Sequence, residues 1–238
     1  MRLWPGTDTP SYNGLKMKHL EQDLERLQRD ILRLATSVEE SITGAVQALR
    51  TRDEELASEV ADGDTEVDNQ SNAVEAECHH LLALYQPVAR DLRRIMAVAM
   101  INTDLERMAD LAVNIAERAL ALIKLPPIQI PTRLQQMTDL TIELVHQSID
   151  AFVTTNPRAA RDVCRRDDEV DRLNVQIIRE LVEQMKRSPE MIEPGLSLFS
   201  AVRHLERIAD HATNIAEDVV FLVEGELIRH QPEAIEAP

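Results

Sequence analysis

The sequence predicts an all-α protein made of two tandem antiparallel three-helix bundles of long helices, related by an internal repeat. The first observation is composition: the 238 residues include only 6 Gly, 3 Phe, 2 Tyr and 1 Trp. This usage, rich in Ala, Leu, Glu and Arg, is typical of packed helices rather than of a sheet. The second is that apolar residues recur at spacings of three and four. The third is a repeat with a period of 100 residues.

The repeat involves a segment of fourteen residues in each half of the chain. The segment D-L-E-R-M-A-D-L-A-V-N-I-A-E, residues 104–117, returns as H-L-E-R-I-A-D-H-A-T-N-I-A-E, residues 204–217. Most positions are identical, and each copy contains two acids four residues apart. The repeat predicts two structurally related halves, each carrying the same acidic pair.

The first half is predicted to contain three helices, with Pro87 in the turn between the second and the third. Residues 1–15 contain Pro and Gly and are expected to be a flexible N-terminal tail. Leu20, Leu24, Leu27 and Ile31 then begin a helical apolar stripe, which predicts a helix over about 16–50. A second helix is expected over about 53–85, and Pro87 marks the turn before a third over about 88–124. Together they make a first bundle over residues 16–125.

The second half repeats this plan after a Pro-rich linker at 126–131. A fourth helix is predicted to about residue 155. Asn156 and Pro157 form an N-cap and first position for a fifth helix ending near Arg187. We expect Ser188-Pro189 and Pro194-Gly195 to form the next corner, before a sixth helix over about 196–224. The second bundle then spans 132–228, with 229–238 as a C-terminal tail.

Charge and composition argue against several functional classes. The net charge of −16 opposes non-specific binding to nucleic acid or to an anionic membrane. No window approaches the roughly 18 apolar residues that span a bilayer, and the N-terminus has no apolar signal region, so we expect a cytoplasmic protein without direct membrane insertion. Cys78 and Cys164 are isolated and are expected to be buried, reduced thiols. No catalytic triad, phosphate loop or dinucleotide motif is visible, which argues against an enzyme.

Acidic pairs at a spacing of four occur on four of the predicted helices. Residues four apart lie on one helix face, with Cβ atoms roughly 5–6 Å apart. If the second and third helices are antiparallel about Pro87, each acid of one helix lies level with an acid of the other. The same symmetry holds in the second half about Ser188-Pro189. The level pairs are Asp64 with Asp110, Asp68 with Glu106, Asp167 with Asp210, and Asp171 with Glu206.

Such clusters of acids favour cation binding. Carboxylates about 6 Å apart repel by roughly 3 kcal/mol per pair at an effective dielectric near 20. A bound cation relieves that repulsion, and oxygen ligands suit Mg²⁺, Mn²⁺, Ca²⁺ or iron. The alternative is a solvated acidic face, because one like-charge pair on a helix costs only about 0.2–0.5 kcal/mol. The recurrence of level pairs in both halves favours the metal interpretation.

Another metal interpretation comes from two Glu-x-x-His elements. Glu77 with His80, and Glu143 with His146, match the element used by ferritin-like di-iron carboxylate bundles. This keeps open the alternative of a di-iron oxidase-type enzyme. That site also needs inward-facing Glu residues from two other helices, for which the sequence offers no assignable partners, so histidines on the surface or satisfied elsewhere are the competing interpretation. His204 and His211, which flank the second acidic pair, are at most additions to that one site.

Three arginines lie at the predicted start of the third helix. Arg90, Arg93 and Arg94 occupy its first turns, where free backbone N–H groups help to hold an anion. This predicts an anion-binding or partner-binding site. The competing interpretation is that exposed arginines pair with local acids.

At these residues the chain resembles the PhoU family of bacterial phosphate-transport and phosphate-signalling regulators. The similarity covers about residues 15–230 and is carried by three motifs: L-L-A-L-Y-Q-P-V-A-R-D-L-R-R at 81–94, the segment at 104–117, and R-H-L-E-R-I-A-D-H-A-T-N-I-A-E-D-V at 203–219. The resemblance implies two similar three-helix bundles whose E/D-x-x-x-D motifs bind multinuclear metal clusters. Carried over by position, those motifs fall on Asp64, Asp68, Glu106, Asp110, Asp167, Asp171, Glu206 and Asp210.

The resemblance also implies a function. It predicts a non-enzymatic negative regulator of phosphate uptake and of the phosphate-starvation response. The expected partners are the ATPase subunit of a phosphate ABC transporter and the sensor histidine kinase PhoR, contacted at the inner face of the membrane. The metal ions are iron, manganese, magnesium or zinc, and we also expect a homodimer.

Overall fold

The structure is a computed structural model that describes residues 12–225, with side chains from residue 18 onward. Within this range the chain forms six α-helices and one 3-10 helix, without strands, and the all-α prediction is confirmed. The predicted tails, 1–15 and 229–238, lie outside the described residues except for 12–15, which already belong to the first helix. The elements are α1 (Tyr12–Thr51), α2 (Glu54–Tyr85), α3 (Ala89–Ile123), α4 (Arg133–Thr154), α5 (Pro157–Arg187), η1 (Pro189–Met191) and α6 (Ile192–Glu224).

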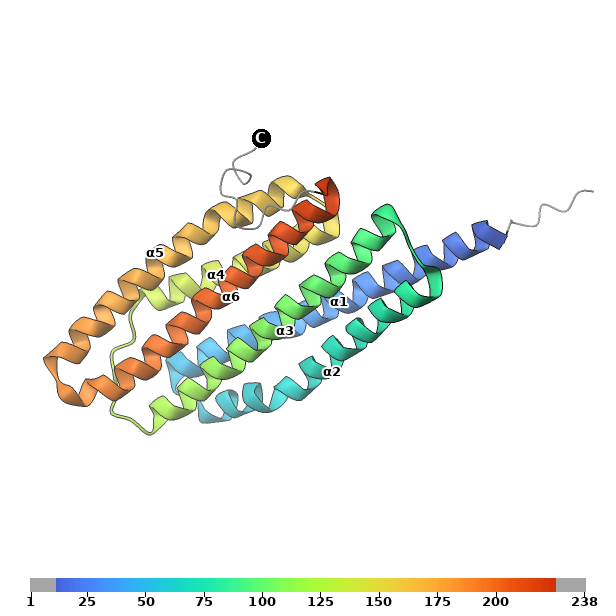
Figure 1. Ribbon diagram of the computed structural model, residues 1–238. Coiled ribbons are helices and arrows are strands. Elements are labelled where there is room, and N and C mark those ends of the chain that lie inside the picture. Colours follow the sequence, from blue (N-terminus) through green and yellow to red (C-terminus); the bar gives the residue numbers. More distant parts are fainter. Residues whose placement is uncertain (1–11, 226–238) are drawn as a thin grey trace, which may run out of the picture.

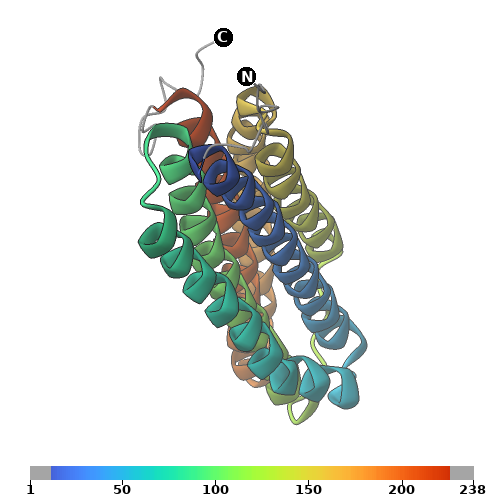
Figure 2. The ribbon, with the colours of Figure 1, turned by 90° about the vertical axis from the view of Figure 1, so that its right-hand side faces the viewer.

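The helices form two antiparallel bundles of three, as the repeat predicts. Helices α1–α3 make one bundle and α4–α6 the other, and the two lie side by side in both views (Figure 1, Figure 2). The apolar stripe of α1 is buried as expected, with Leu27 and Leu34 fully inaccessible to solvent. No helix in residues 12–225 combines the length and the apolar character needed to cross a bilayer.

Local sequence signals fix the starts of α2 and α5. The Asp53 side chain accepts a hydrogen bond from the backbone N–H of Leu56, which caps α2. The Asn156 side chain accepts from the N–H groups of Arg158 and Ala159, and Pro157 occupies the first turn of α5. The start of α5 agrees with the sequence prediction, because proline lacks only an N–H that a helix start leaves unpaired.

The corner before α6 differs from the prediction. Pro194 and Gly195 do not form a turn but lie in the first turn of α6, which follows η1 directly. Pro194 is tolerated there because its missing N–H would have no partner within the helix. A Cβ atom on Gly195 would lie 2.6 Å from Cγ of Met185, so the glycine allows α5 and α6 to pack closely at this end.

The two bundles are joined by one continuous apolar core, which the sequence does not predict. Helices α3 and α6 form the most extensive helix pair of the described chain, although they belong to different bundles. Within this contact, Nδ1 of His211 lies 2.8 Å from Oδ1 of Asp104, and both side chains are buried. The amide of Asn214 donates to the same oxygen at 3.3 Å. We call these three residues the seam triad.

The two seam helices run in opposite directions. Asp104, near the middle of α3, contacts His211 and Asn214 of α6. Further along α3, the charges of Glu117 and Arg118 shift the pKa of His204, which comes earlier in α6. Burial is the main cause that lowers the pKa of His204, followed by Arg207 and Arg118. Figure 1 shows the consequence: the α2–α3 corner and the α5–α6 corner lie at opposite ends of the molecule.

Both cysteines are buried and free, as predicted. Burial is the main cause that raises the pKa of Cys78 to about 12, and it does the same for Cys164. Thiols with such pKa values stay protonated at neutral pH and are poor nucleophiles and metal ligands.

The seam triad should stabilise the assembled pair of bundles. In Asp104→Ala, the buried His211 and the partly buried Asn214 lose their common acceptor, and loss of a buried hydrogen-bond partner costs about 1–3 kcal/mol. Urea denaturation should show this decrease in the free energy of unfolding. The control Asp62→Ala removes an exposed acid from α2 and should change stability by less than about 0.5 kcal/mol. Equal stability of the two variants would contradict the assigned role.

Candidate metal centres

The first acidic face lies between α2 and α3, where the hairpin geometry places it. Asp64 and Asp68 of α2 face Glu106 and Asp110 of α3. Burial first, and then the charges of Asp68 and Asp110, raises the pKa of Asp64. Burial, Asp110 and Asp68 likewise raise the pKa of Glu106. The four carboxylates are therefore close enough to repel one another.

The second acidic face lies between α5 and α6 and is more strongly perturbed. Burial first, and then the charges of Asp210, Asp171, Asp168 and Glu206, raises the pKa of Asp167 to about 7. The pKa values of Glu206 and Asp210 are raised as well, again mainly by burial. The predicted level pairs of this half thus lie together in space.

Two carboxylate oxygens on these faces have no partner. Oδ1 of Asp64 and Oε2 of Glu206 are buried and accept no hydrogen bond from the described residues. A buried carboxylate oxygen without a donor carries a large desolvation cost, which a cation offsets directly. Each face therefore contains one oxygen suited to a hard metal ion.

Local counter-charges balance the second face only in part. Nη1 of Arg203 donates to Oε1 of Glu206 at 2.7 Å, from the preceding turn of α6. This pairing lowers the pKa of Glu206, but burial and Asp210 outweigh it, so the net direction is upward. The face keeps an excess of negative charge that a metal ion would neutralise.

The carboxylates are close but do not form a ready coordination shell. Among the side chains of residues 18–225, no three Asp, Glu, His or Cys groups converge on a single metal position. On the first face, Asp68 and Glu106 border a cavity of about 280 Å³ that also exposes Asn72, Glu75 and His79. This cavity gives an ion access to the carboxylates from solvent.

The two Glu-x-x-His elements do not form a di-iron site, and the alternative based on them is not supported. His80 is exposed, and Glu77 pairs instead with Arg26 at 3.4 Å. His146 lies near Glu39 and Asp150 on the surface. Glu143 forms two hydrogen bonds with Arg166, both at 2.8 Å. The elements point outward because the apolar stripes of their helices occupy the interior.

The histidines beside the second acidic pair also have other roles. His211 belongs to the seam triad, and Nε2 of His204 lies 3.2 Å from the hydroxyl of Ser200. Neither imidazole joins the acidic face. His204 and His211 stand where the first copy of the repeat has Asp104 and Leu111. The two copies therefore differ at the contact between the bundles.

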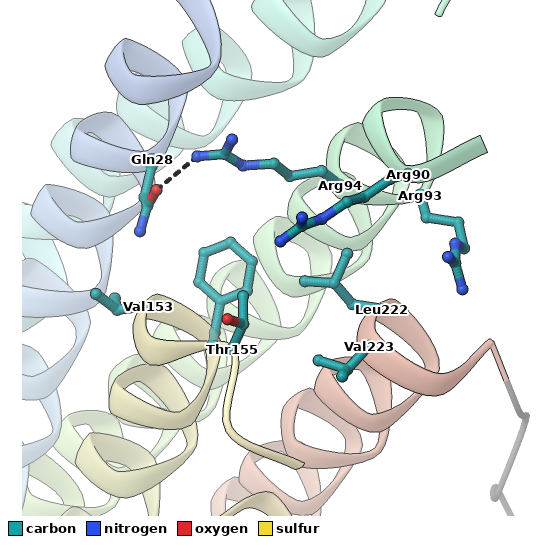
Figure 3. A pocket seen from close by; sticks show the side chains of 9 residues that line it. Gln28, Arg90, Arg93, Arg94, Val153, Thr155, Leu222 and Val223 are labelled. Atoms are coloured by element: carbon teal, nitrogen blue, oxygen red, sulfur yellow. Dashed lines mark hydrogen bonds between the residues drawn. The ribbon is translucent and has the colours of Figure 1, made fainter. Parts of the chain in front are cut away.

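The three predicted arginines lie at the start of α3, at the end of the molecule where the two bundles meet. Arg94 donates to Glu21 at 3.2 Å and to Gln28 at 2.9 Å. Together with Arg90 and Arg93 it borders a cavity of about 410 Å³ between the bundles (Figure 3). Pairing with a local acid, the competing interpretation, thus applies to Arg94. The other lining residues, such as Thr155 and Leu222, come from distant parts of the chain and carry no signal in the sequence.

The fold and the two acidic faces define a class: a helical protein of two related three-helix bundles, each with one carboxylate-rich hairpin. The profile of the PhoU domain matches the chain twice, over residues 31–119 and 134–219. The chain therefore belongs to the PhoU family, and the resemblance seen in the sequence is confirmed.

Curated relatives are similar over nearly the whole chain. A protein of Aquifex aeolicus, named phosphate-specific transport system accessory protein PhoU homolog, is 40% identical over 212 residues, which are 89% of this chain and 96% of the relative. Its namesake in Caulobacter vibrioides is 35% identical over 216 residues, covering 90% and 94% of the two chains.

Solved structures agree in fold. The crystal structure of PhoU from Pseudomonas aeruginosa has a TM-score of 0.82 and 34% identity, covering 87% of this chain and 99% of its own. The phosphate transport system regulatory protein PhoU from Streptococcus pneumoniae has a TM-score of 0.81 and 31% identity, with 87% and 98% covered.

The raised pKa of Asp167 predicts an unusual pH dependence for the metal-free protein. Between about pH 4, the ordinary value for Asp, and pH 7, the folded state binds a proton that the unfolded state has lost. The free energy of unfolding therefore falls as the pH rises through this window. In Asp167→Asn this contribution disappears, so stability should fall less steeply with pH.

The measurement is urea denaturation in the presence of a chelator, at several pH values from 5 to 8. The control Asp62→Asn makes the same isosteric substitution at an exposed acid of α2, away from this face, and should leave the pH dependence unchanged. If Asp167→Asn and wild type show the same dependence on pH, the raised pKa of Asp167 is wrong.

Proposed function

We propose that this protein is a non-enzymatic negative regulator of phosphate uptake and of the phosphate-starvation response. The observation that carries the proposal is membership of the PhoU family, whose curated relatives are named accessory proteins of a phosphate-specific transport system. The proposed action is contact with two proteins: the ATPase subunit of a phosphate ABC transporter and the sensor histidine kinase PhoR. This takes place in the cytoplasm, at the inner face of the membrane.

Exposed apolar side chains support a role in protein contact. Leu92 and Met96 at the start of α3 are 38% and 42% exposed, and Ile192 and Leu196 at the start of α6 are 46% and 55% exposed. Each position in α6 lies 100 residues after its counterpart in α3, so the repeat preserves the exposed pair. Exposed apolar clusters of this kind mark binding surfaces more often than isolated exposed residues do.

The acidic faces are proposed as binding sites for metal ions. Asp64, Asp68, Glu106 and Asp110 would hold ions on one face, and the four equivalent acids Asp167, Asp171, Glu206 and Asp210 on the other. Iron, manganese, magnesium or zinc is the proposed ion. When bound, the metal supplies positive charge that cancels the repulsion between the helices of each hairpin. The carboxylates in turn fix the two hairpins, and with them the surfaces offered to partners. A homodimer stays a prediction.

Metal binding should raise thermal stability. A ligand that binds only the folded state stabilises it by about 2.7 kcal/mol at a hundredfold excess over its Kd. Melting curves of chelator-treated protein should shift upward with added Mn²⁺, Mg²⁺, Zn²⁺ or Fe³⁺, and the shift should shrink in Asp167→Asn/Asp171→Asn. The matched control Glu55→Gln/Glu59→Gln changes another acidic pair at a spacing of four, exposed on α2. Identical melting curves with and without all four metals would refute metal binding.

The regulatory proposal is tested by Glu206→Gln/Asp210→Asn. The amides keep the side-chain volume and remove the repulsion, so the metal-free variant should be at least as stable as wild type. In cells that depend on this protein, the variant should express phosphate-starvation genes despite ample phosphate. A pull-down from phosphate-replete cells should recover the transporter ATPase and the kinase with wild type and less of each with the variant.

The control Glu55→Gln/Glu59→Gln should repress normally and recover both partners. If the acidic-face variant represses normally after losing its metal, the ions have no part in signalling. If wild type recovers neither partner, the adaptor function itself is wrong.

A further inference from the structure

A cavity of about 410 Å³ lies between the two bundles, near the start of α3. Its walls come from both halves: Gln28 and the three arginines from the first bundle, and Phe152, Val153, Thr155, Leu222 and Val223 from the second. In Figure 3, Arg90 and Arg94 extend over the opening from α3, whereas Leu222 and Val223 approach it from α6. The size falls within the range of roughly 300–1,000 Å³ that is usual for small-molecule sites.

The positive charge of this cavity is only partly compensated. Arg94 pairs with Glu21, but neither Arg90 nor Arg93 forms an ion pair with an acid among the side chains of residues 18–225. Arg93 rests against Gly225 at the end of α6, within 2.7 Å of the place a Cβ atom would take. In Figure 3 the Arg93 side chain points away from the opening, so Arg90 is the arginine that extends over the cavity without an acidic partner among the described side chains.

The start of α3 adds to the positive potential. Val88 precedes the helix and provides no side-chain cap, so the first backbone N–H groups keep their hydrogen-bonding capacity. The helix dipole places partial positive charge at the same end. Asp91 is the acid of this first turn and reduces the effect, but it does not line the cavity.

The rest of the lining is largely apolar. Phe152 and Leu222 are buried, and Val153 and Val223 stand at the rim with 36% and 39% exposure. The hydroxyl of Thr155 and the amide of Gln28 are the uncharged polar groups of the lining. A ligand that fills this cavity needs an anionic group for the arginines and a less polar body for the opposite wall.

We infer that this cavity binds an organic phosphate of about nucleotide size, with its phosphate on Arg90 and Arg94 and its organic part against Phe152 and Leu222. A phosphate dianion has enough oxygens to accept from two or more guanidinium groups, whereas one carboxylate is satisfied by a single bidentate arginine. The volume beside the arginines indicates a ligand larger than inorganic phosphate. The inference does not depend on the metal-binding faces or on the proposed partners.

A ligand in this cavity would act on the arrangement of the two bundles. It would contact α1 and α3 of the first bundle and α4 and α6 of the second. Binding to both walls favours the arrangement in which the walls face each other, by mass action. A small phosphate compound bound at this site would thus stabilise the relative position of the two bundles.

The test is titration calorimetry of the full-length protein with three probes: ADP, inorganic phosphate and adenosine. ADP should bind more tightly than either of the others, because only ADP has both a phosphate group for the arginines and a base for the apolar wall. Arg90→Ala and Arg94→Ala should each weaken ADP binding roughly tenfold or more, as expected for loss of a charged hydrogen bond. The control Arg172→Ala removes the same charge from the exposed side of α5 and should leave ADP binding unchanged.

A second variant tests the shape of the cavity without changing its charge. Val223→Trp places a large ring at the rim and should abolish ADP binding while the melting temperature stays near that of wild type. The inference is overturned if wild type does not bind ADP or if the arginine variants bind it normally. It is equally overturned if inorganic phosphate binds as tightly as ADP, since the apolar wall then has no role. Metal-induced thermal shifts should be the same in these variants and in wild type, which separates this site from the acidic faces.

Discussion

The contact between α3 and α6 is the constraint on which the rest of the structure depends. Each of these helices closes its own three-helix bundle and also packs against the other bundle, so the apolar core continues across the molecule. Asp104, His211 and Asn214 place a polar hydrogen-bonded group inside this contact, and such a group fixes how the two helices align. A shift of either helix along its axis would leave a buried acid or imidazole without its partner.

The same helices also carry the acidic faces. Asp104 and Glu106 are two residues apart, which at 3.6 residues per turn places them on nearly opposite sides of α3. One side therefore holds the bundles together while the other faces α2 with its like charges. The repulsion on each acidic face is of the order of 3 kcal/mol per pair at most. Burial of a single large apolar side chain stabilises the folded state by about 1.5–3 kcal/mol. The extensive core can therefore support two unfavourable faces without metal.

Most of the fold follows from local signals, and the acidic faces follow from symmetry. Pro87 and Pro157 mark helix limits because proline restricts the backbone in a fixed way. In an antiparallel hairpin, residues at equal distances from the turn lie side by side, so the acidic pairs could be matched from the sequence. Pro194-Gly195 misled the prediction because proline fits the first helical turn as well as a corner. The seam triad and the cavity wall opposite the predicted arginines escaped prediction for another reason: their residues come from separate helices, and no periodicity within one helix records how two bundles dock.

The antiparallel seam gives the molecule two equivalent but separate ends. The exposed pairs Leu92 with Met96, and Ile192 with Leu196, occupy matching positions of the repeat, yet α3 and α6 begin at opposite ends of the molecule (Figure 1). Two surfaces so far apart can be covered by two proteins at once without a clash, which suits an adaptor better than a single-site inhibitor. The arginines lie in the same first turns of α3 as Leu92, beside one of these ends only. An anion held there would change one end directly, and the other only through the shared core.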